Sequence, residues 1–360
     1  MREPEPRLTS PDTPGHVSVA RLPDYWYVAC RSRDLRRAPI ARTILGTPLA
    51  LFRDGRGKAA AVLDRCPHRN VPLSQGRVVK TGNLECRYHG WQFDVEGACR
   101  LVPGLVESGE AKGRRVETFA VREHDGLVWV YAASDAAPAR EPFALPLVGA
   151  PGYTTVVREV EAPASVHATA ENTLDVPHTA YLHKGLFRGG EKHRIEAIVR
   201  RWPDRVEAEY VGEPRPPGIV GRLLSPSGGV VEHWDRFFLP SVAQVEYRLG
   251  TENHIVVTSL MTPVSDFHTR LFAVISFRVR LPGRLVRLVL EPLAMRIFRQ
   301  DVDILAEQTA SIRRFGGERF MSTDVDVLGR EIWRLMKHAE GGVVAGQGEE
   351  PVVRKLEMMV

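Results

Sequence analysis

The sequence predicts an α+β chain of two domains: an all-β domain, then a domain in which strands precede a long helix. Its 360 residues suffice for one large domain or two medium ones. Short apolar runs separated by turn residues fill the first third of the chain, and a helical pattern covers 284–315. The composition, 43% hydrophobic and 26% charged, excludes collagen-like, coiled-coil and wholly disordered chains.

The first domain is predicted from apolar runs bounded by Gly and Asp turns. These runs lie at 25–28, 48–52, 59–63 and 126–131. We therefore place an all-β domain at 21–135. The Pro-rich residues 1–20 predict a weakly structured tail, and the Ala- and Pro-rich residues 136–152 predict a linker between domains.

The second domain is placed at 153–340, with a C-terminal tail at 341–360. Within this domain, segments of strand-like alternation are separated by segments of helical periodicity. A Pro-rich segment at 213–229 is expected to form a long loop. The strands are expected at 153–161, 194–212 and 230–280, and the helical segments at 163–185 and 284–315, the latter kinked at Pro292.

The charge balance and the cysteine content exclude some classes of protein. The 49 Lys and Arg exceed the 44 Asp and Glu by only five, without a long basic run, so nucleic-acid binding is not expected. Four cysteines are too few for a disulfide scaffold of this size. Neither a secretory signal nor an apolar stretch of about 18 residues is found, so we expect a cytoplasmic location.

Two short pairs of Cys and His indicate a metal centre. Cys66-Pro67-His68 and Cys86-Arg87-Tyr88-His89 each place one Cys and one His beside turn residues. Zinc takes two Cys and two His tetrahedrally, and a [2Fe-2S] cluster takes two Cys on one iron and two His on the other. Because zinc fingers pair Cys with Cys and His with His, the mixed pairs favour the cluster.

The segment resembles the Rieske domain of Rieske-type non-haem iron oxygenases. The resemblance covers both ligand loops, the following Gly90-Trp91-Gln92-Phe93-Asp94, and Gly97. It implies that two cysteines bind one iron and two histidines the other: Cys66 and Cys86, and His68 and His89. Cys30 and Cys99 fall outside the pattern and are interpreted as small buried hydrophobic residues.

A second pattern lies in the predicted helical segment 163–185. Asp175 and His178 are three residues apart and share a helical face, whereas His178 and His183 are five apart and need a π-type distortion to face one side. The spacing resembles the family's Asp-x-x-His-x-x-x-x-His segment. This resemblance implies that His178 and His183 bind a mononuclear iron, and that Asp175 links a cluster-binding His of a neighbouring subunit to His178. Asn172 either hydrogen-bonds near the iron or caps the helix.

The third iron ligand is expected on the long helix, because two His and one carboxylate form the facial triad of non-haem Fe(II) oxygenases. Asp301 shares a helical face with inward-looking residues, and Asp303 lies on roughly the opposite side. That face comprises Ile297, Asp301, Ile304, Leu305 and Gln308. Asp301 is therefore the predicted ligand, and the Gln300-Asp301 pair resembles the family's C-terminal ligand site.

The resemblance also implies an activity. The chain would be the oxygenase component of its system, a homotrimer whose catalytic domain holds a long helix within an antiparallel sheet. It would use O₂ and electrons passed from NAD(P)H through a separate flavin reductase, a ferredoxin or both, because neither a dinucleotide fingerprint nor a plant-type ferredoxin motif is present. Its length resembles the monooxygenase branch, which hydroxylates or oxidatively demethylates lipophilic rings, sterol-like or aromatic.

Three alternatives stay open at this point. The same ligands serve aromatic-ring cis-dihydroxylation. A chain with the cluster but without the triad would be a non-catalytic electron-transfer protein. The basic amphipathic segment 283–298 can lie on a membrane surface, although packing of its apolar stripe on the core is the commoner arrangement.

Overall fold

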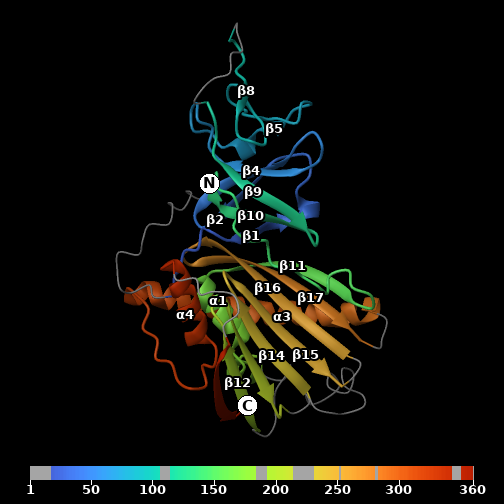
Figure 1. Cartoon of the computed structure of the whole chain (residues 1–360), viewed down its shortest axis with the longest axis vertical. Helices are drawn as coiled ribbons and strands as arrows, with labels where there is room; N and C mark the ends of the chain where they lie inside the picture. Colours follow the sequence, from blue (N-terminus) through green and yellow to red (C-terminus); the bar gives the residue numbers. More distant parts are fainter. Residues whose placement is uncertain are drawn as a thin grey trace. The chain divides into compact units, whose positions relative to one another are not determined.

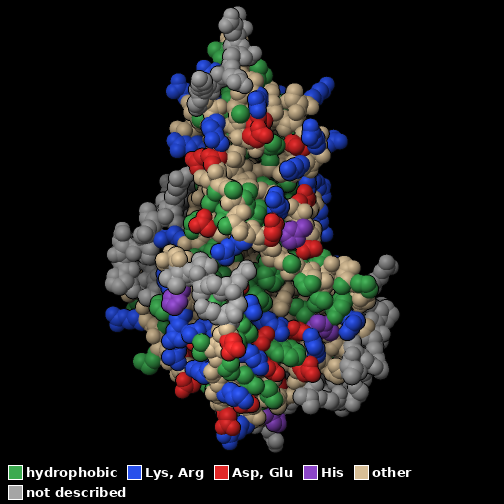
Figure 2. Space-filling view, viewed as in Figure 1, with side chains coloured by type: hydrophobic (Ala, Val, Ile, Leu, Met, Phe, Trp, Pro, Cys, Tyr) green, Lys and Arg blue, Asp and Glu red, His purple; other side chains and the backbone are tan. Residues whose placement is uncertain are grey.

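The computed structural model describes residues 18–105, 114–183, 193–213, 231–250, 253–279, 283–342 and 350–359. The chain forms two compact units, Leu22–Ala144 and Leu145–Val360, and the described residues before Leu22 belong to the second (Figure 1). The boundary falls inside the segment 136–152 that the sequence predicts as a linker. Among the coloured residues in Figure 2, basic and acidic side chains are interspersed over the face shown.

The first unit is built on a six-stranded antiparallel sheet in the order β1-β10-β9-β4-β3-β2. Its strands are β1 (Trp26–Arg31), β2 (Ile40–Ile44), β3 (Thr47–Arg53), β4 (Ala59–Leu63), β9 (Thr118–His124) and β10 (Leu127–Ser134). The apolar runs that predict strands form this core, since all five residues of β4 are buried.

A second, four-stranded sheet of very short strands completes the first unit: β5 (Arg77–Val78), β6 (Leu84–Glu85), β7 (Gln92–Phe93) and β8 (Cys99–Leu101). One Cys/His segment lies between β4 and β5, and the other lies between β6 and β7. Both segments are therefore loops carried by strands.

The second unit is built on an eight-stranded antiparallel sheet in the order β11-β17-β16-β15-β14-β13-β12-β18. Its strands are β11 (Thr154–Ala162), β12 (Arg194–Arg201), β13 (Arg205–Val211), β14 (Val231–Phe238), β15 (Val242–Leu249), β16 (Asn253–Ser265), β17 (His268–Arg278) and β18 (Val352–Met359).

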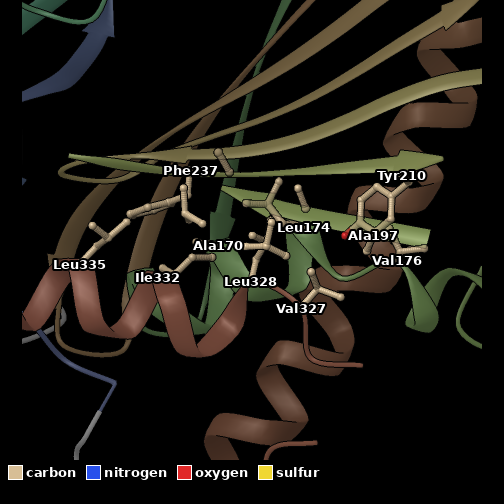
Figure 3. Close-up of a cluster of buried hydrophobic side chains, with 14 of the residues drawn as sticks. Ala170, Leu174, Val176, Ala197, Tyr210, Phe237, Val327, Leu328, Ile332 and Leu335 are labelled. Carbon is tan, nitrogen blue, oxygen red and sulfur yellow. The ribbon is translucent and has the colours of Figure 1, made fainter. Parts of the chain in front are cut away.

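Helices cover one face of this sheet: α1 (Val166–Leu174), the 3₁₀ turn η3 (Pro177–Ala180), α3 (Gly283–Phe315) and α4 (Gly329–Glu340). Small sheet residues such as Ala243 and Ala273 let α1 approach closely, and α4 packs beside α1 (Figure 1). The core between them is drawn in Figure 3, where Leu174, Phe237 and Ile332 lie close together. Within the described ranges, no helix has both the length and the apolar character needed to cross a membrane.

Both predicted tails contain ordered residues, so these predictions are wrong in part. Val352–Met359 forms β18 and pairs with β12 over its whole length. Most side chains of β18 are exposed, which is why its sequence looks like a tail. At the other end Ser18 and Val19 are buried, and the backbone N–H of Ser18 donates to the Glu318 carboxylate at 2.7 Å.

Other elements differ from prediction in extent. The strand expected at 194–212 is a hairpin, because Trp202 N–H donates to Arg205 C=O and turns the chain. The helix α3 continues without a break across Pro292. In the first half of α3, Ile297 is half-buried and Arg296 is exposed, as the amphipathic pattern predicts. Several apolar side chains earlier in this helix lie outside the described residues. Of the loop expected at 213–229, only Glu213 lies within the described residues.

Candidate functional site

The two Cys/His loops have the same backbone geometry despite different sequences. In each loop the Cys N–H donates to the carbonyl five positions on, and the Cys carbonyl accepts from the N–H four positions on. These bonds join Cys66 with Val71 and Asn70 at 2.9 Å each, and Cys86 with Trp91 and Gly90 at 2.8 and 3.0 Å. The residue four positions after each cysteine therefore adopts the left-handed backbone conformation, with φ of 62° at Asn70 and 70° at Gly90.

These loops bring four metal-binding side chains together. The cysteines are each 2% exposed, and burial together with the neighbouring Cys86 thiol raises the pKa of Cys66 to about 11. The rings of His68 and His89 lie 4.4 Å apart between centroids, and His68 stacks on Trp91. The Nδ1 atom of His68 is buried and has no hydrogen-bond partner among the described residues. Two buried thiols and an unpartnered ring nitrogen fit a centre bound by both sulfur and nitrogen.

Three further donors converge in the second unit, from the segment after α1 and from α3. The Nε2 atoms of His178 and His183 lie 3.2 Å apart, and Asp301 Oδ1 lies 3.5 and 3.1 Å from them. This Oδ1 atom is buried and, within the described part of the chain, accepts no hydrogen bond. Two ring nitrogens and one carboxylate oxygen that face a common point are the donor set of a non-haem iron.

The electrostatics of this triad suit a cation. Burial lowers the pKa of His178, but the contacts with Asp175 and Asp301 outweigh it and raise that pKa to about 9. Burial raises the pKa of Asp301, but its contacts with the two histidines hold the pKa below its usual value. The carboxylate is thus ionised at neutral pH, as a metal ligand must be.

On each imidazole, the Nδ1 atom, which faces away from the triad, makes a hydrogen bond of its own. His178 Nδ1 donates to the main-chain carbonyl of Asp175, and His183 Nδ1 donates to Oε1 of Gln300 at 2.9 Å. The Asp175 carboxylate accepts the backbone N–H of His178 at 3.2 Å and lies 3.4 Å from its Nδ1. Because both Nδ1 atoms donate to these oxygens, Nε2 is on each ring the nitrogen that faces the triad and would bind a metal ion in place of a proton.

The expected π-type distortion is wrong. The helix α1 ends at Leu174, Asp175 is extended with φ −88° and ψ 108°, and the chain re-enters a 3₁₀ turn at Pro177. Proline lacks the N–H that would continue α1. Both histidines lie after the end of α1, so the tight turns that follow the helix, rather than a bulge within it, bring His178 and His183 to one side.

The structure agrees with the prediction for Asp303 and disagrees with the predictions of helix capping by Asn172 and of an inward-facing Ile304. Asn172 lies inside α1, whose N-cap is Ser165, so the capping explanation is wrong. Asp303 is exposed, as the helical face predicts. Ile304, expected to face inward, is 41% exposed because it lies about 60° around the helix from Asp301, at the margin of the buried face. The role of Gln300 is missed by sequence reasoning, whose only signal is its position before Asp301.

Two known families match this architecture. The family model for the Rieske [2Fe-2S] domain matches residues 25–120, and that for the vanillate O-demethylase oxygenase C-terminal domain matches 162–340. The chain therefore belongs to the Rieske non-haem iron oxygenases, whose cofactors are a Rieske cluster and a mononuclear iron.

Particular relatives refine this likeness. The chain is 33% identical over 219 residues to the oxygenase component of dicamba O-demethylase from Stenotrophomonas maltophilia, covering 58% of this chain and 62% of the relative. It is 35% identical over 201 residues to 4β-methylsterol monooxygenase from Methylococcus capsulatus, covering 54% and 52%. The crystal structure of dicamba monooxygenase bound to dicamba superposes with a TM-score of 0.77 at 25% identity, covering 90% of this chain and 98% of that one. The alignments thus span only 62% and 52% of these two curated relatives.

Proposed function

We propose that the chain is the oxygenase component of a multicomponent Rieske system that hydroxylates or oxidatively demethylates a lipophilic ring compound. The observation that carries the proposal is the triad of His178, His183 and Asp301, which follows a Rieske domain on the same chain. A chain that only transferred electrons would have no use for this second donor set, whose buried carboxylate oxygen lacks any other partner among the described residues.

In this proposal the two donor sets have separate tasks. Cys66, Cys86, His68 and His89 hold the [2Fe-2S] cluster, and His178, His183 and Asp301 hold the iron. When bound, the cluster would supply single electrons, and the iron would supply the site at which O₂ is activated next to the substrate. One oxygen atom enters the substrate and the other leaves as water, which consumes two electrons and two protons per turnover.

A separate ferredoxin or flavin reductase supplies these electrons. We further propose a homotrimer in which Asp175 links the cluster-binding histidine of one subunit to His178 of the next. The position of Asp175 supports this, because its carboxylate contacts His178 while its side chain keeps partial access to solvent. None of the four cysteines forms a disulfide, which suits the reducing cytoplasm that we propose as the location.

The substrate class is supported by the sheet face on which α1 packs. Ala243 and Ala273 lie under α1, and because side chains alternate along strands, the next residues on the same face continue beyond it. Five of these residues are apolar or aromatic and only half-buried: Val245, Tyr247, Ile255, Val257 and Ile275. Such a wall fits a lipophilic ring.

This wall has one polar end. Tyr247 stacks on His233 with centroids 4.1 Å apart, and His233 bonds Glu213 at 2.7 Å and Asp235 at 3.0 Å. The relatives named as an O-demethylase and a methylsterol monooxygenase support oxidation at a methyl group.

The test has two stages. The dithionite-reduced protein is examined by EPR, and the Fe(II)-loaded protein is examined again with nitric oxide, which should give a Rieske signal and a high-spin iron–nitrosyl signal. The protein is then supplied with a surrogate reductase and ferredoxin, ¹⁸O₂, and a panel of methoxyarenes and methylated sterols. One labelled oxygen in the product, or a demethylated product with formaldehyde, supports the proposal. Two labelled oxygens in a cis-diol would make the chain a dioxygenase, and absence of the nitrosyl signal would reduce it to an electron carrier.

A further inference from the structure

We propose that Gln300 is a positioning residue that fixes the orientation and the protonated nitrogen of His183. The inference rests on the proposed role of His183 as an iron ligand. His183 is 2% exposed, and its Nδ1 atom lies 2.9 Å from Oε1 of Gln300. A side-chain carbonyl oxygen can only accept, so the hydrogen of the neutral imidazole must be on Nδ1. The lone pair is then on Nε2, which lies 3.1 Å from Asp301 Oδ1.

The two histidines are held by different means. His178 donates to a main-chain carbonyl, that of Asp175 three residues earlier. That contact is local and survives any side-chain substitution at Asp175. His183 instead depends on a side chain 117 residues away in sequence. Its orientation therefore depends on the tertiary placement of α3.

The helix α3 thus contributes two adjacent residues to the triad and its surroundings. Asp301 supplies the carboxylate oxygen, and the residue before it holds the imidazole that lies nearest that oxygen. A small displacement of α3 would move two of the three donors together and leave His178 in place. Contacts of this kind behind a metal ligand contribute about 10- to 100-fold to metal affinity.

The experiment compares three variants with the unmodified protein. Gln300→Met keeps the length of the side chain and removes the acceptor, and Gln300→Glu keeps an acceptor. Gln308→Met makes the same change two turns further along α3, where the side-chain carbonyl oxygen is buried without a partner among the described residues. Each protein, with its cluster intact and its mononuclear site emptied, is titrated anaerobically with Fe(II). Occupancy and the rhombic splitting are read from the EPR signal of the nitric oxide adduct.

We expect Gln300→Met to weaken Fe(II) binding about 10- to 100-fold and to change the splitting of the nitrosyl signal. Gln300→Glu should restore both, and Gln308→Met should leave both unchanged. Equal far-UV circular dichroism and equal unfolding midpoints of the second unit in all four proteins show that each has folded, and an equal reduced-cluster signal shows that the first unit is unchanged. Unchanged affinity and splitting in Gln300→Met, or a loss in Gln300→Glu as large as that in Gln300→Met, would overturn the inference. Failure of the unmodified protein to bind Fe(II) would instead overturn the ligand set itself.

Discussion

The two donor sets of this chain are built in opposite ways. Each Cys/His loop of the first unit is closed by hydrogen bonds within a few residues, so its geometry is local. The triad of the second unit draws His178 and His183 from the turns that follow α1, and Asp301 from a helix more than a hundred residues later. The first set therefore depends on local turns, and the second depends on the packing of α1, α3 and the sheet.

The largest expected effect is the complete loss of one metal centre while the other is retained. Asp301→Ala removes the carboxylate donor, so we expect loss of the iron–nitrosyl signal and of substrate turnover, with the reduced-cluster EPR signal unchanged. Cys86→Ala should give the converse, a lost cluster signal with the nitrosyl signal retained. A nitrosyl signal of normal size in Asp301→Ala would show that this residue is not a ligand.

Asp175→Ala tests the link between the sets. The main-chain carbonyl that holds His178 Nδ1 remains after this substitution, so we expect both metal centres to load normally. Turnover should nevertheless fall to background, because the carboxylate is the proposed path between subunits. Single-turnover transfer from the reduced cluster to the iron measures this directly. Retained turnover in a protein loaded with both metals would remove Asp175 from the path.

A core substitution should affect the second set more than the first. Ile332 is fully buried against α1, and Ile332→Ala is expected to cost about 2–5 kcal/mol of stability in the second unit. Arg334→Ala on the same helix removes only a surface ion pair and should cost about 0–1 kcal/mol. Chemical denaturation followed by circular dichroism, with cluster absorbance recorded in parallel, distinguishes the two. Equal losses from both substitutions would contradict the packing described for α4.

The smallest expected effect lies in one Cys/His loop. Gly90 has a φ of 70°, and a Cβ there would lie 3.0 Å from Pro103 Cγ, so Gly90→Ala should destabilise the loop by about 1–2 kcal/mol. Gly55→Ala is the matched change in the same unit, without a positive φ and with ordinary contacts. The temperature at which cluster absorbance is lost should fall for Gly90→Ala and stay nearly constant for Gly55→Ala. A constant temperature for Gly90→Ala would show that the loop tolerates a side chain.

The contrast between the two sets also explains what sequence reasoning could predict. Cys66, His68, Cys86 and His89 are recognisable because residue type and spacing alone define their loops. Asp301 is separated from Asp303 by helical periodicity, a second local signal. The end of α1 at Leu174 is not predicted, and a π-type distortion is expected instead, because tertiary packing decides between these two backbone conformations. Gln300 is missed because glutamine is ordinary in a helix, and only the tertiary contact with His183 gives it a role.

The strand β18 has a consequence for solubility and for protein engineering. It covers the edge of β12, a strand whose alternate residues Ile195, Ala197 and Val199 are buried. Without β18, a row of unpaired N–H and C=O groups beside an apolar stripe would be free to pair with another molecule. The exposed charges Arg354, Lys355 and Glu357 on β18 itself discourage such edge-to-edge aggregation. A version of the protein shortened before Val352 would therefore keep every proposed metal ligand and still be prone to precipitate.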